Sequence, residues 1–311
     1  MNLGTVGVDA LMDSMAGAEL AQFARKIEKL GYSALWFPEA FGRDPFALAA
    51  HLLTVTEKLI VGTAIANVWK REPVAMLSGA RTLAEMFPGR FVLGIGISHG
   101  PMMTRVNINY AKPLTFMRDY LARMKDAPYG AARPSSEAPI VVAALLPKML
   151  QLAAAETDGT IPAFVTPERT AQIRAEIGPD KLICVQQISM LEPDASKART
   201  AIRGLIAFYL GLPNYLQSLR LMGFDDSTSP PAAAIELSMR WLRGVTSRRS
   251  AIGSRRSTKP ARPMCALRWS GRKGAPGRGV LRLAATASVR RPRSARSKRS
   301  HHDELANPTS H

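Results

Sequence analysis

The stretch from Ala34 to Thr63, ALWFPEAFGRDPFALAAHLLTVTEKLIVGT, holds one complete strand–helix–strand unit. It opens with the apolar run Ala34–Phe37, continues with a helical segment from about Pro45 to Val55, and ends in a second apolar run, Leu59–Thr63. Strands that are apolar along their whole length are typical of a parallel sheet that is covered on both faces. The stretch therefore predicts a β/α repeat.

The same alternation extends over the first 210 residues of the chain. Further strands are predicted at Val6–Val8, Phe91–Ile97, Ile140–Leu145, Thr160–Phe164 and Leu182–Leu191, and further helices near residues 20–30, 73–87, 113–125, 147–155, from 167 onward and 194–210. Seven successive units of this kind favour an α/β fold of the (β/α)8 TIM-barrel type over a doubly wound sheet.

An eighth unit is missing from this pattern. Past Leu237 the periodicity is lost, and the chain becomes rich in Arg, Ser, Pro, Ala and Gly. We therefore expect an incomplete barrel domain over residues 1–237 and a disordered, Arg-rich, low-complexity tail over residues 238–311. The apolar run Cys265–Leu267 is short and flanked by arginines, so we expect the first and seventh strands of the barrel to remain unpaired.

The positive charge of the chain belongs almost wholly to this tail. The net charge is +18, but from Arg240 onward 19 Lys and Arg face only Asp303 and Glu304. A basic tail predicts salt-sensitive, non-specific binding to nucleic acid. Specific recognition is not expected, because Trp269 is the only aromatic residue past Trp241 and no binding module is evident.

The composition of the tail has a second interpretation, which is translation in a wrong reading frame. Allowed codons for Ser238–Ser270, read in a shifted frame, give a string that contains VAWGD, an amphipathic helix, a glycine and the apolar run AGAADVCVAVV. That order is what the missing eighth unit requires. We therefore hypothesise a frameshift near Leu237–Ser238, which resequencing of the locus tests.

Several protein classes are not expected from this composition. Cys184 and Cys265 give no disulfide framework or zinc spacing, and the five histidines are scattered or terminal, so no metal site is predicted. A signal peptide is not expected, because Asp9 and Asp13 stand where its basic start and apolar stretch would lie. A membrane span is not expected either, because no apolar run reaches 18 residues. We expect a cytoplasmic protein with a small-molecule substrate and no membrane partner.

Active sites of TIM barrels lie where strands end and the βα loops begin, so the strand ends supply the candidate residues. Glu39 directly follows a buried strand and is placed to contact a polar cofactor; the alternative is that it caps a turn. Asn67 follows the third strand and is placed to hydrogen-bond a ligand beside Trp69, although both side chains have structural alternatives.

Two further candidates follow later strands. His99 is the last residue but one of the segment Gly94–Gly100, which begins like a dinucleotide-binding fingerprint. His99 stands where that fingerprint requires its last glycine, so a Rossmann fold is rejected. Its imidazole titrates near neutral pH, which suits a proton donor or a cofactor contact as well as a structural role. Thr166 and Pro167 open a helix whose free amides suit a phosphate group; the alternative is an ordinary N-cap.

Taken together, these segments resemble the luciferase-like monooxygenase superfamily. The resemblance rests on LWFPEAFGRDPF (35–46), GTAIANVWKREP (62–73), FPGRFVLGIGISHGP (87–101), GTIPAFVTPERT (159–170) and LGLPNY (210–215). The nearest branch is that of the actinobacterial oxidoreductases that use coenzyme F420, a deazaflavin. The shifted-frame strings VAWGD and AGAADVCV also resemble the C-terminal region of this family.

The resemblance implies a deazaflavin across the mouth of the barrel and hydride transfer to or from a small organic substrate. It places Glu39 near the cofactor, a non-proline cis peptide at Ala64–Ile65 behind the ring, and His99 where some relatives carry a catalytic glutamate. Thr166 and Pro167 match the cofactor phosphate region. Ala40 stands where some relatives have histidine, so their acid–base scheme does not transfer. A homodimer is compatible with the resemblance.

Three alternatives to a deazaflavin-dependent oxidoreductase stay open from the sequence. The first is a monooxygenase of the same fold that uses flavin mononucleotide (FMN). The second is an inactive relative that lost its eighth unit through the frameshift. The third is non-specific nucleic-acid binding through the tail.

Overall fold

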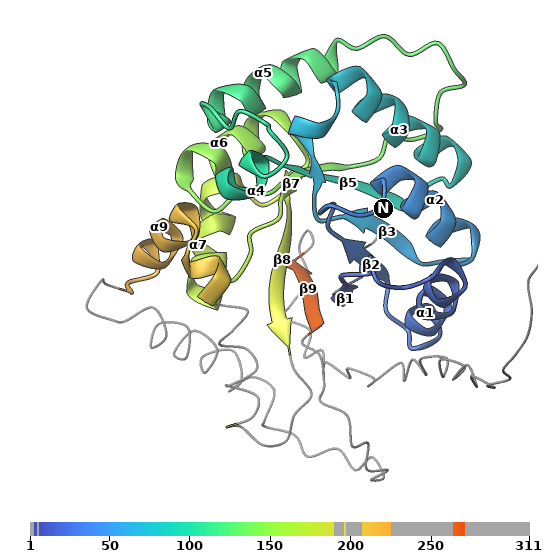
Figure 1. Cartoon of the computed structure of the whole chain (residues 1–311), viewed down its shortest axis with the longest axis horizontal. Coiled ribbons are helices and arrows are strands. Elements are labelled where there is room, and N and C mark those ends of the chain that lie inside the picture. The colour runs from blue at the N-terminus through green and yellow to red at the C-terminus, as the bar shows by residue number, and fades with distance from the viewer. Residues whose placement is uncertain (1–2, 5, 190–195, 197–206, 225–263, 271–311) are drawn as a thin grey trace, which may run out of the picture.

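The structure is a computed structural model, and it describes residues 3–4, 6–189, 196, 207–224 and 264–270. It confirms a (β/α) barrel, with helices around the outside of a mostly parallel sheet (Figure 1). The strands are β1 Val6–Asp9, β2 Ala34–Phe37, β3 Ile60–Thr63, β4 Ala66–Asn67, β5 Phe91–Gly96, β6 Ile140–Val142, β7 Gly159–Thr160, β8 Leu182–Ser189 and β9 Met264–Ser270.

The helices begin where the sequence places proline or a capping residue. They are α1 Gly17–Lys29, α2 Pro45–Thr54, α3 Pro73–Met86, α4 Gly100–Thr104, α5 Pro113–Lys125, α6 Pro147–Glu156, α7 Pro167–Ile177 and α9 Pro213–Leu221, with a 3-10 turn at Val68–Lys70. Asp44 shows why α2 starts where it does, since its side chain accepts hydrogen bonds from the amides of Phe46 and Ala47.

The sheet runs in the order β3-β2-β1-β9-β8-β7-β6-β5-β4, and β3 also pairs with β5, so the strands form a ring. β3 and β4 are two parts of one interrupted strand, because both pair in parallel with β5. At the end of β3 the Thr63 hydroxyl links this strand to β5, because it donates a hydrogen bond to the Gly94 carbonyl at 2.7 Å and accepts one from the Gly94 amide at 2.9 Å. The interruption directs the chain after β3 toward the barrel mouth.

The expectation that the first and seventh strands stay unpaired is wrong. β9 lies between β1 and β8 and pairs antiparallel with both, with Ala266 opposite Val8 on one side and Gln187 on the other (Figure 1). Two exposed strand edges can accept any extended segment, because their free amides and carbonyls are satisfied by backbone alone. The rest of the expected tail, residues 238–263 and 271–311, lies outside the described residues.

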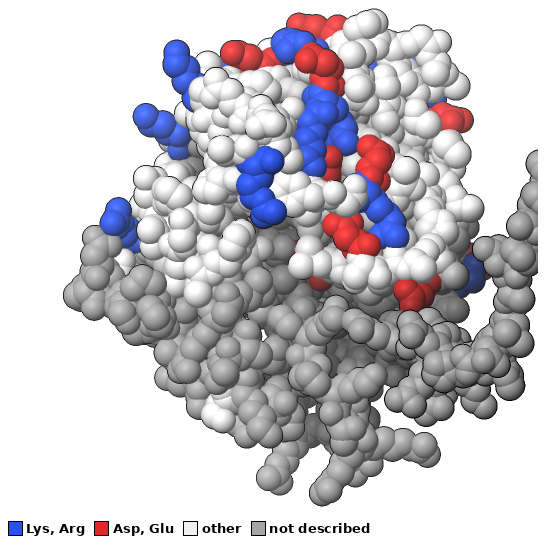
Figure 2. All heavy atoms as spheres, in the orientation of Figure 1, with Lys and Arg blue, Asp and Glu red and all other residues white. Residues whose placement is uncertain are grey.

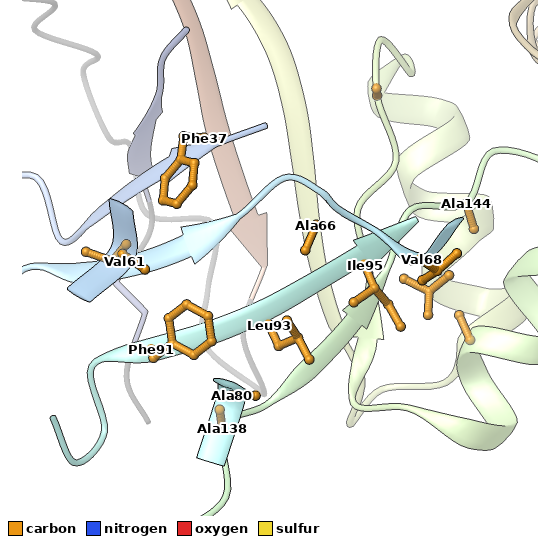
Figure 3. Packing of buried hydrophobic residues seen from close by; sticks show 14 of the residues in the cluster. Phe37, Val61, Ala66, Val68, Ala80, Phe91, Leu93, Ile95, Ala138 and Ala144 are labelled. Carbon is orange, nitrogen blue, oxygen red and sulfur yellow. The ribbon is translucent and has the colours of Figure 1, made fainter. Parts of the chain in front are cut away.

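Two apolar layers hold the barrel together. The inner one fills the ring with residues from alternate strand positions: Leu3, Ala34, Trp36, Ile60, Val92, Val141, Ile161 and Cys184. The outer one lies between strands and helices, and Figure 3 shows Phe91, Leu93 and Ile95 of β5 within it. Successive residues of a strand therefore point alternately into the ring and out toward the helices.

The predicted and observed elements differ mainly in length. β7 covers only Gly159–Thr160, although the sequence predicts a strand to Phe164, and Phe164 itself has a φ of 55°. The structure also contains α4 and α9, which the periodicity does not predict. The predicted helix at 194–210 falls largely outside the described residues. None of the helices that the structure describes is long and apolar enough to cross a membrane.

Candidate active site

The carboxyl ends of the parallel strands meet at one mouth of the barrel. All the candidate residues follow these ends: Glu39 after β2, Ala64 and Ile65 after β3, His99 after β5 and Thr166 after β7. The topology thus confirms that the candidates belong to the same end of the ring, which is where active sites of such barrels are built.

Glu39 is engaged by its neighbours in the βα loops. Its carboxylate pairs with both terminal nitrogens of Arg71, at 2.6 and 3.1 Å, and accepts a hydrogen bond from the backbone amide of Asn67 at 2.8 Å. Burial opposes the charge of Arg71, but hydrogen bonds and attraction from Glu39 and Asp44 outweigh it and raise the Arg71 pKa. This arrangement favours the structural alternative, in which Glu39 ties the loop after β2 to the one after β4.

The expected cis peptide between Ala64 and Ile65 is confirmed. The segment around it is held on both sides, since the Ala64 amide donates to the Phe37 carbonyl at 2.7 Å and the Glu39 amide donates to the Ile65 carbonyl at 3.0 Å. The Ile65 side chain lies over Gly96, where an added Cβ would meet Ile65 Cγ1 at 2.8 Å. A glycine is needed at residue 96 for this close approach.

Asn67 acts as a cap in this structure. Its side-chain oxygen accepts from the Trp69 amide at 3.0 Å and its amide nitrogen donates to Met103 Sδ at 3.3 Å, in a buried setting. Trp69 stacks on Phe116, with ring centroids 3.7 Å apart, and donates from Nε1 to the Ile97 carbonyl at 2.8 Å. The structural alternatives for both residues are therefore favoured.

His99 is the candidate that keeps a free polar atom. Its Nδ1 is buried and has no hydrogen-bond partner among the described residues. Burial lowers the His99 pKa, and a hydrogen bond with Asn214 only partly offsets this, so the imidazole is neutral at physiological pH. Tyr215 lies beside it, with ring centroids 5.6 Å apart. Both Asn214 and Tyr215 come from α9, and nothing in the local sequence pattern except the family resemblance places that segment here.

Thr166 caps α7, and a buried guanidinium lies in the first turn of the same helix. Thr166 Oγ1 accepts from the Arg169 amide at 3.2 Å, and Pro167 takes the first helical position. Arg169 pairs with Glu176 through Nη1, but its Nε and Nη2 are buried and have no partner among the described residues. Ser218 Oγ of α9 is likewise buried without a partner there. These donors suit an anionic group.

Asp9, which ends β1 at the same mouth, is not among the residues predicted from the sequence. Its side chain is 3% exposed and accepts a hydrogen bond from Gln186 Nε2. Burial raises the Asp9 pKa to about 7, against the opposing effect of bonds from Gln186 and the Ala10 backbone. The signal that could have found it is an aspartate placed at the end of a buried strand.

Charges on the described surface are of mixed sign. Figure 2 shows Lys and Arg side chains next to Asp and Glu on the face in view. The described residues also contain no group of three or more His, Cys, Asp or Glu that is placed to hold a metal ion. The mouth combines the Glu39–Arg71 ion pair, the buried Arg169 guanidinium and aromatic side chains, a mixture of polar and apolar groups that suits an organic ligand.

The chain is similar to known enzymes in its sequence. It is 27% identical over 230 residues to the 5,10-methylenetetrahydromethanopterin reductase of Archaeoglobus fulgidus, which covers 65% of this chain and 69% of that protein. It is 26% identical over 132 residues to the F420-dependent glucose-6-phosphate dehydrogenase of Kineococcus radiotolerans, over 39% and 38% of the two chains.

The fold also matches a solved structure. The coenzyme F420-dependent tetrahydromethanopterin reductase of Methanopyrus kandleri superposes with a TM-score of 0.58 at 17% identity, over 75% of this chain and 82% of that one. The family model for luciferase-like monooxygenases matches residues 3–255. Because that match spans well over half of the chain, the protein belongs to the luciferase-like monooxygenase family.

Proposed function

We propose that this protein is a deazaflavin-dependent oxidoreductase that transfers hydride between coenzyme F420 and a small organic substrate. The observation that carries the proposal is the unpartnered, buried Nδ1 of His99 at the mouth of a luciferase-like barrel. Buried polar atoms are almost always hydrogen-bonded in proteins, so one that has no partner among the described residues is a place for a ligand. The similarity to an F420-dependent dehydrogenase supports the choice of cofactor.

The residues present fit such a cofactor at two places. The Nε and Nη2 of Arg169, which have no partner among the described residues, would hold its phosphate at the start of α7. His99, Ala64 and Ile65 would contact its ring system at the other place. When it is bound, a deazaflavin supplies a two-electron hydride donor or acceptor.

The chain's own contribution at the ring would be to hold a neutral, largely buried imidazole. Burial keeps His99 uncharged, so one of its nitrogens donates and the other accepts a hydrogen bond. Phe164, Tyr209 and Tyr215 pack against one another beside it, with the Phe164 and Tyr209 ring centroids 4.7 Å apart. This aromatic cluster would exclude water from the reacting atoms. Glu39 would act indirectly, by fixing the loop that lines the site.

Fluorescence quenching with purified cofactors tests the assignment. We expect coenzyme F420 to bind the full chain at lower concentration than FMN. Arg169→Lys should weaken F420 binding about tenfold, because it removes the forked guanidinium donors while keeping the charge. Arg118→Lys, at an exposed site on α5, is the matched control. Tighter binding of FMN would instead support the monooxygenase alternative, and no binding of either would refute the proposal.

We further propose that residues 1–237 are the oxidoreductase domain and that a frameshift separates them from a foreign tail. The support is the loss of periodicity past Leu237 and the shifted-frame strings that resemble the family. The test is to express the frame-restored chain beside this one and titrate both with F420. Equal affinity would show that the altered C-terminus leaves the site intact, whereas binding only to the restored chain would identify this one as inactive.

A further inference from the structure

Asp9 lies on the inner face of the barrel. The preceding residue, Val8, belongs to the outer layer together with Leu20 of α1, so Asp9 points the other way. Its partner in the β1–β2 ladder is Trp36, a member of the inner layer whose Nε1 is buried without a partner among the described residues. The carboxyl is therefore inside the ring at the end of β1, next to a second polar atom whose bonding capacity is unused.

Gln186 is fixed in position to hold this carboxyl. The backbone amide of Gln186 donates a hydrogen bond to the Pro162 carbonyl at 2.9 Å, and the backbone carbonyl of Gln186 accepts one from the Phe164 amide at 3.0 Å. Two residues before it, Cys184 belongs to the inner layer, which places the Gln186 side chain on the same face. From there its Nε2 donates to Asp9 Oδ2.

The described side chains around Asp9 carry no charge that would pair with it. β2 presents Trp36, β8 presents Gln186, and β9 has Cys265 opposite Asp9 in the ladder, while the backbone amide of Ala10 is a further donor. The cations of the adjoining loops have other partners: the Arg43 guanidinium donates to the Asp13 backbone carbonyl, and Arg71 pairs with Glu39. A carboxyl without a cation beside it is stable as the neutral acid when it is buried.

We propose that Asp9, positioned by Gln186, is the catalytic residue that exchanges the proton accompanying hydride transfer. The inference rests on the proposed function. In the reducing direction, a bound reduced deazaflavin would supply hydride to the carbon of a C=O or C=N group. The π electrons pass to the oxygen or nitrogen, which takes the proton of the Asp9 carboxyl and leaves a carboxylate that solvent reprotonates. In the oxidising direction the Asp9 carboxylate takes the proton from the O–H or N–H group, the C=O or C=N bond forms, and the hydride of the adjoining C–H bond would pass to the oxidised cofactor.

His99 and Asp9 then have complementary properties at one mouth. Burial keeps the imidazole neutral and raises the pKa of the carboxyl to about 7, so the site has a group that accepts a hydrogen bond and a group that can give or take a proton near neutral pH. Two titratable groups with pKa values shifted in opposite directions are a usual way to divide acid and base roles near pH 7. The substrate class that this pair fits is an uncharged carbonyl or imine compound, or the matching alcohol or amine.

The protonation state is tested first on the full chain without cofactor. Infrared difference spectra across a pH titration should show the C=O stretch of a neutral carboxylic acid that disappears with a midpoint near pH 7. Asp9→Asn should abolish this band, and Asp119→Asn, at an exposed site on α5, should retain it. Gln186→Met should raise the midpoint, because the hydrogen bond that favours the carboxylate is lost. A band that survives in Asp9→Asn, or that is absent from the unaltered chain, overturns the inference.

The second measurement separates this inference from the proposed function. The side-chain oxygen of the Asp9→Asn variant can still accept from Gln186, so this variant should fold. Its urea midpoint at pH 8 should be higher than that of the unaltered chain, because the cost of a buried carboxylate is removed, and it should bind F420 with unchanged affinity. Its kcat with a carbonyl substrate should fall by about 10²- to 10⁴-fold, and the pH-dependent limb near 7 should vanish. If F420 binds no variant, the proposed function fails while the infrared result stands. If Asp9→Asn retains the turnover and pH profile of the unaltered enzyme, the catalytic role of Asp9 is refuted.

Discussion

At the scale of single residues, the mouth of the barrel contains two carboxyl groups with opposite surroundings. Glu39 has a guanidinium, an ammonium group and a backbone amide around it, whereas Asp9 has one neutral amide side chain and a backbone amide. A carboxylate in the first setting orients its partners, and a carboxyl in the second can carry a proton near neutral pH. Position after a strand does not distinguish them, because both follow buried strands.

The anchoring role of Glu39 leads to a stability prediction. Glu39→Gln keeps the shape of the side chain but leaves the largely buried Arg71 charge without its main partner. Removal of one member of a buried ion pair typically costs about 3 kcal/mol or more, so we expect a loss of unfolding free energy of that order. Urea denaturation at neutral pH measures it.

Asp44→Asn is the matched control because it acts on the same arginine. Asp44 bonds to Arg71 at 3.1 Å, but its side chain is 54% exposed, and an exposed pair contributes about 1 kcal/mol or less. Asparagine also preserves the N-cap of α2. If the two variants lose the same stability, the Glu39–Arg71 pair is not the anchor of these loops.

At the scale of elements, the interrupted strand formed by β3 and β4 depends on a close approach to β5. An added Cβ on Gly94 would lie 1.9 Å from the Thr63 carbonyl oxygen and 2.7 Å from Ile161 Cδ1. The first of these atoms belongs to the backbone and cannot move aside as a flexible side chain can. Gly94→Ala should therefore push β3 and β5 apart and cost about 3 kcal/mol, at the upper end of overpacking effects.

Gly17→Ala provides the comparison for this prediction. Gly17 starts α1, and a Cβ there would meet nothing within 4 Å, so alanine should be neutral or stabilise by up to about 1 kcal/mol. Thermal unfolding of both variants beside the unaltered chain gives the two values. A Gly94→Ala protein as stable as Gly17→Ala would mean that the two strands do not approach as closely as described.

Helix starts were easier to predict than strand lengths. The prolines at 45, 73, 113, 147 and 167 take the first helical position, where a missing amide proton costs nothing. β7 is shorter than its apolar run, because past Thr160 the buried segment keeps an isolated bridge between Ala163 and Gln186 and does not form a continuous ladder. An apolar run records burial, and burial does not require strand pairing.

At the scale of the whole molecule, β9 completes the ring that the first seven units leave open. Both of its neighbours are strands from the body, so its backbone is bonded on two sides. Ala266→Pro would remove a backbone amide in the middle of this strand, and proline in a central strand is poorly tolerated. We expect a lower Tm and more aggregation by light scattering, because the edges of β1 and β8 become available to other chains.

Ala131→Pro, in the exposed loop before β6, is the control for this effect. That position belongs to no ladder, so its Tm and light scattering should stay close to those of the unaltered chain. If Ala266→Pro also leaves both quantities unchanged, β9 does not contribute to closure of the barrel. The frame-restored chain should have a higher Tm than both the Ala131→Pro and the Ala266→Pro variant if the native eighth unit packs a helix as well as a strand.

The sequence by itself determined the seven parallel strands of the barrel, the helix starts and the end of the barrel at which the candidate residues lie. These follow from hydrophobic period and turn chemistry, which depend on residues only a few positions apart. The tertiary structure decided the rest: β9 as the closing strand, Glu39 as the partner of Arg71, and Asp9 beside Gln186, 177 positions away. Such contacts depend on which side chains the closed ring brings together, and no local pattern records that.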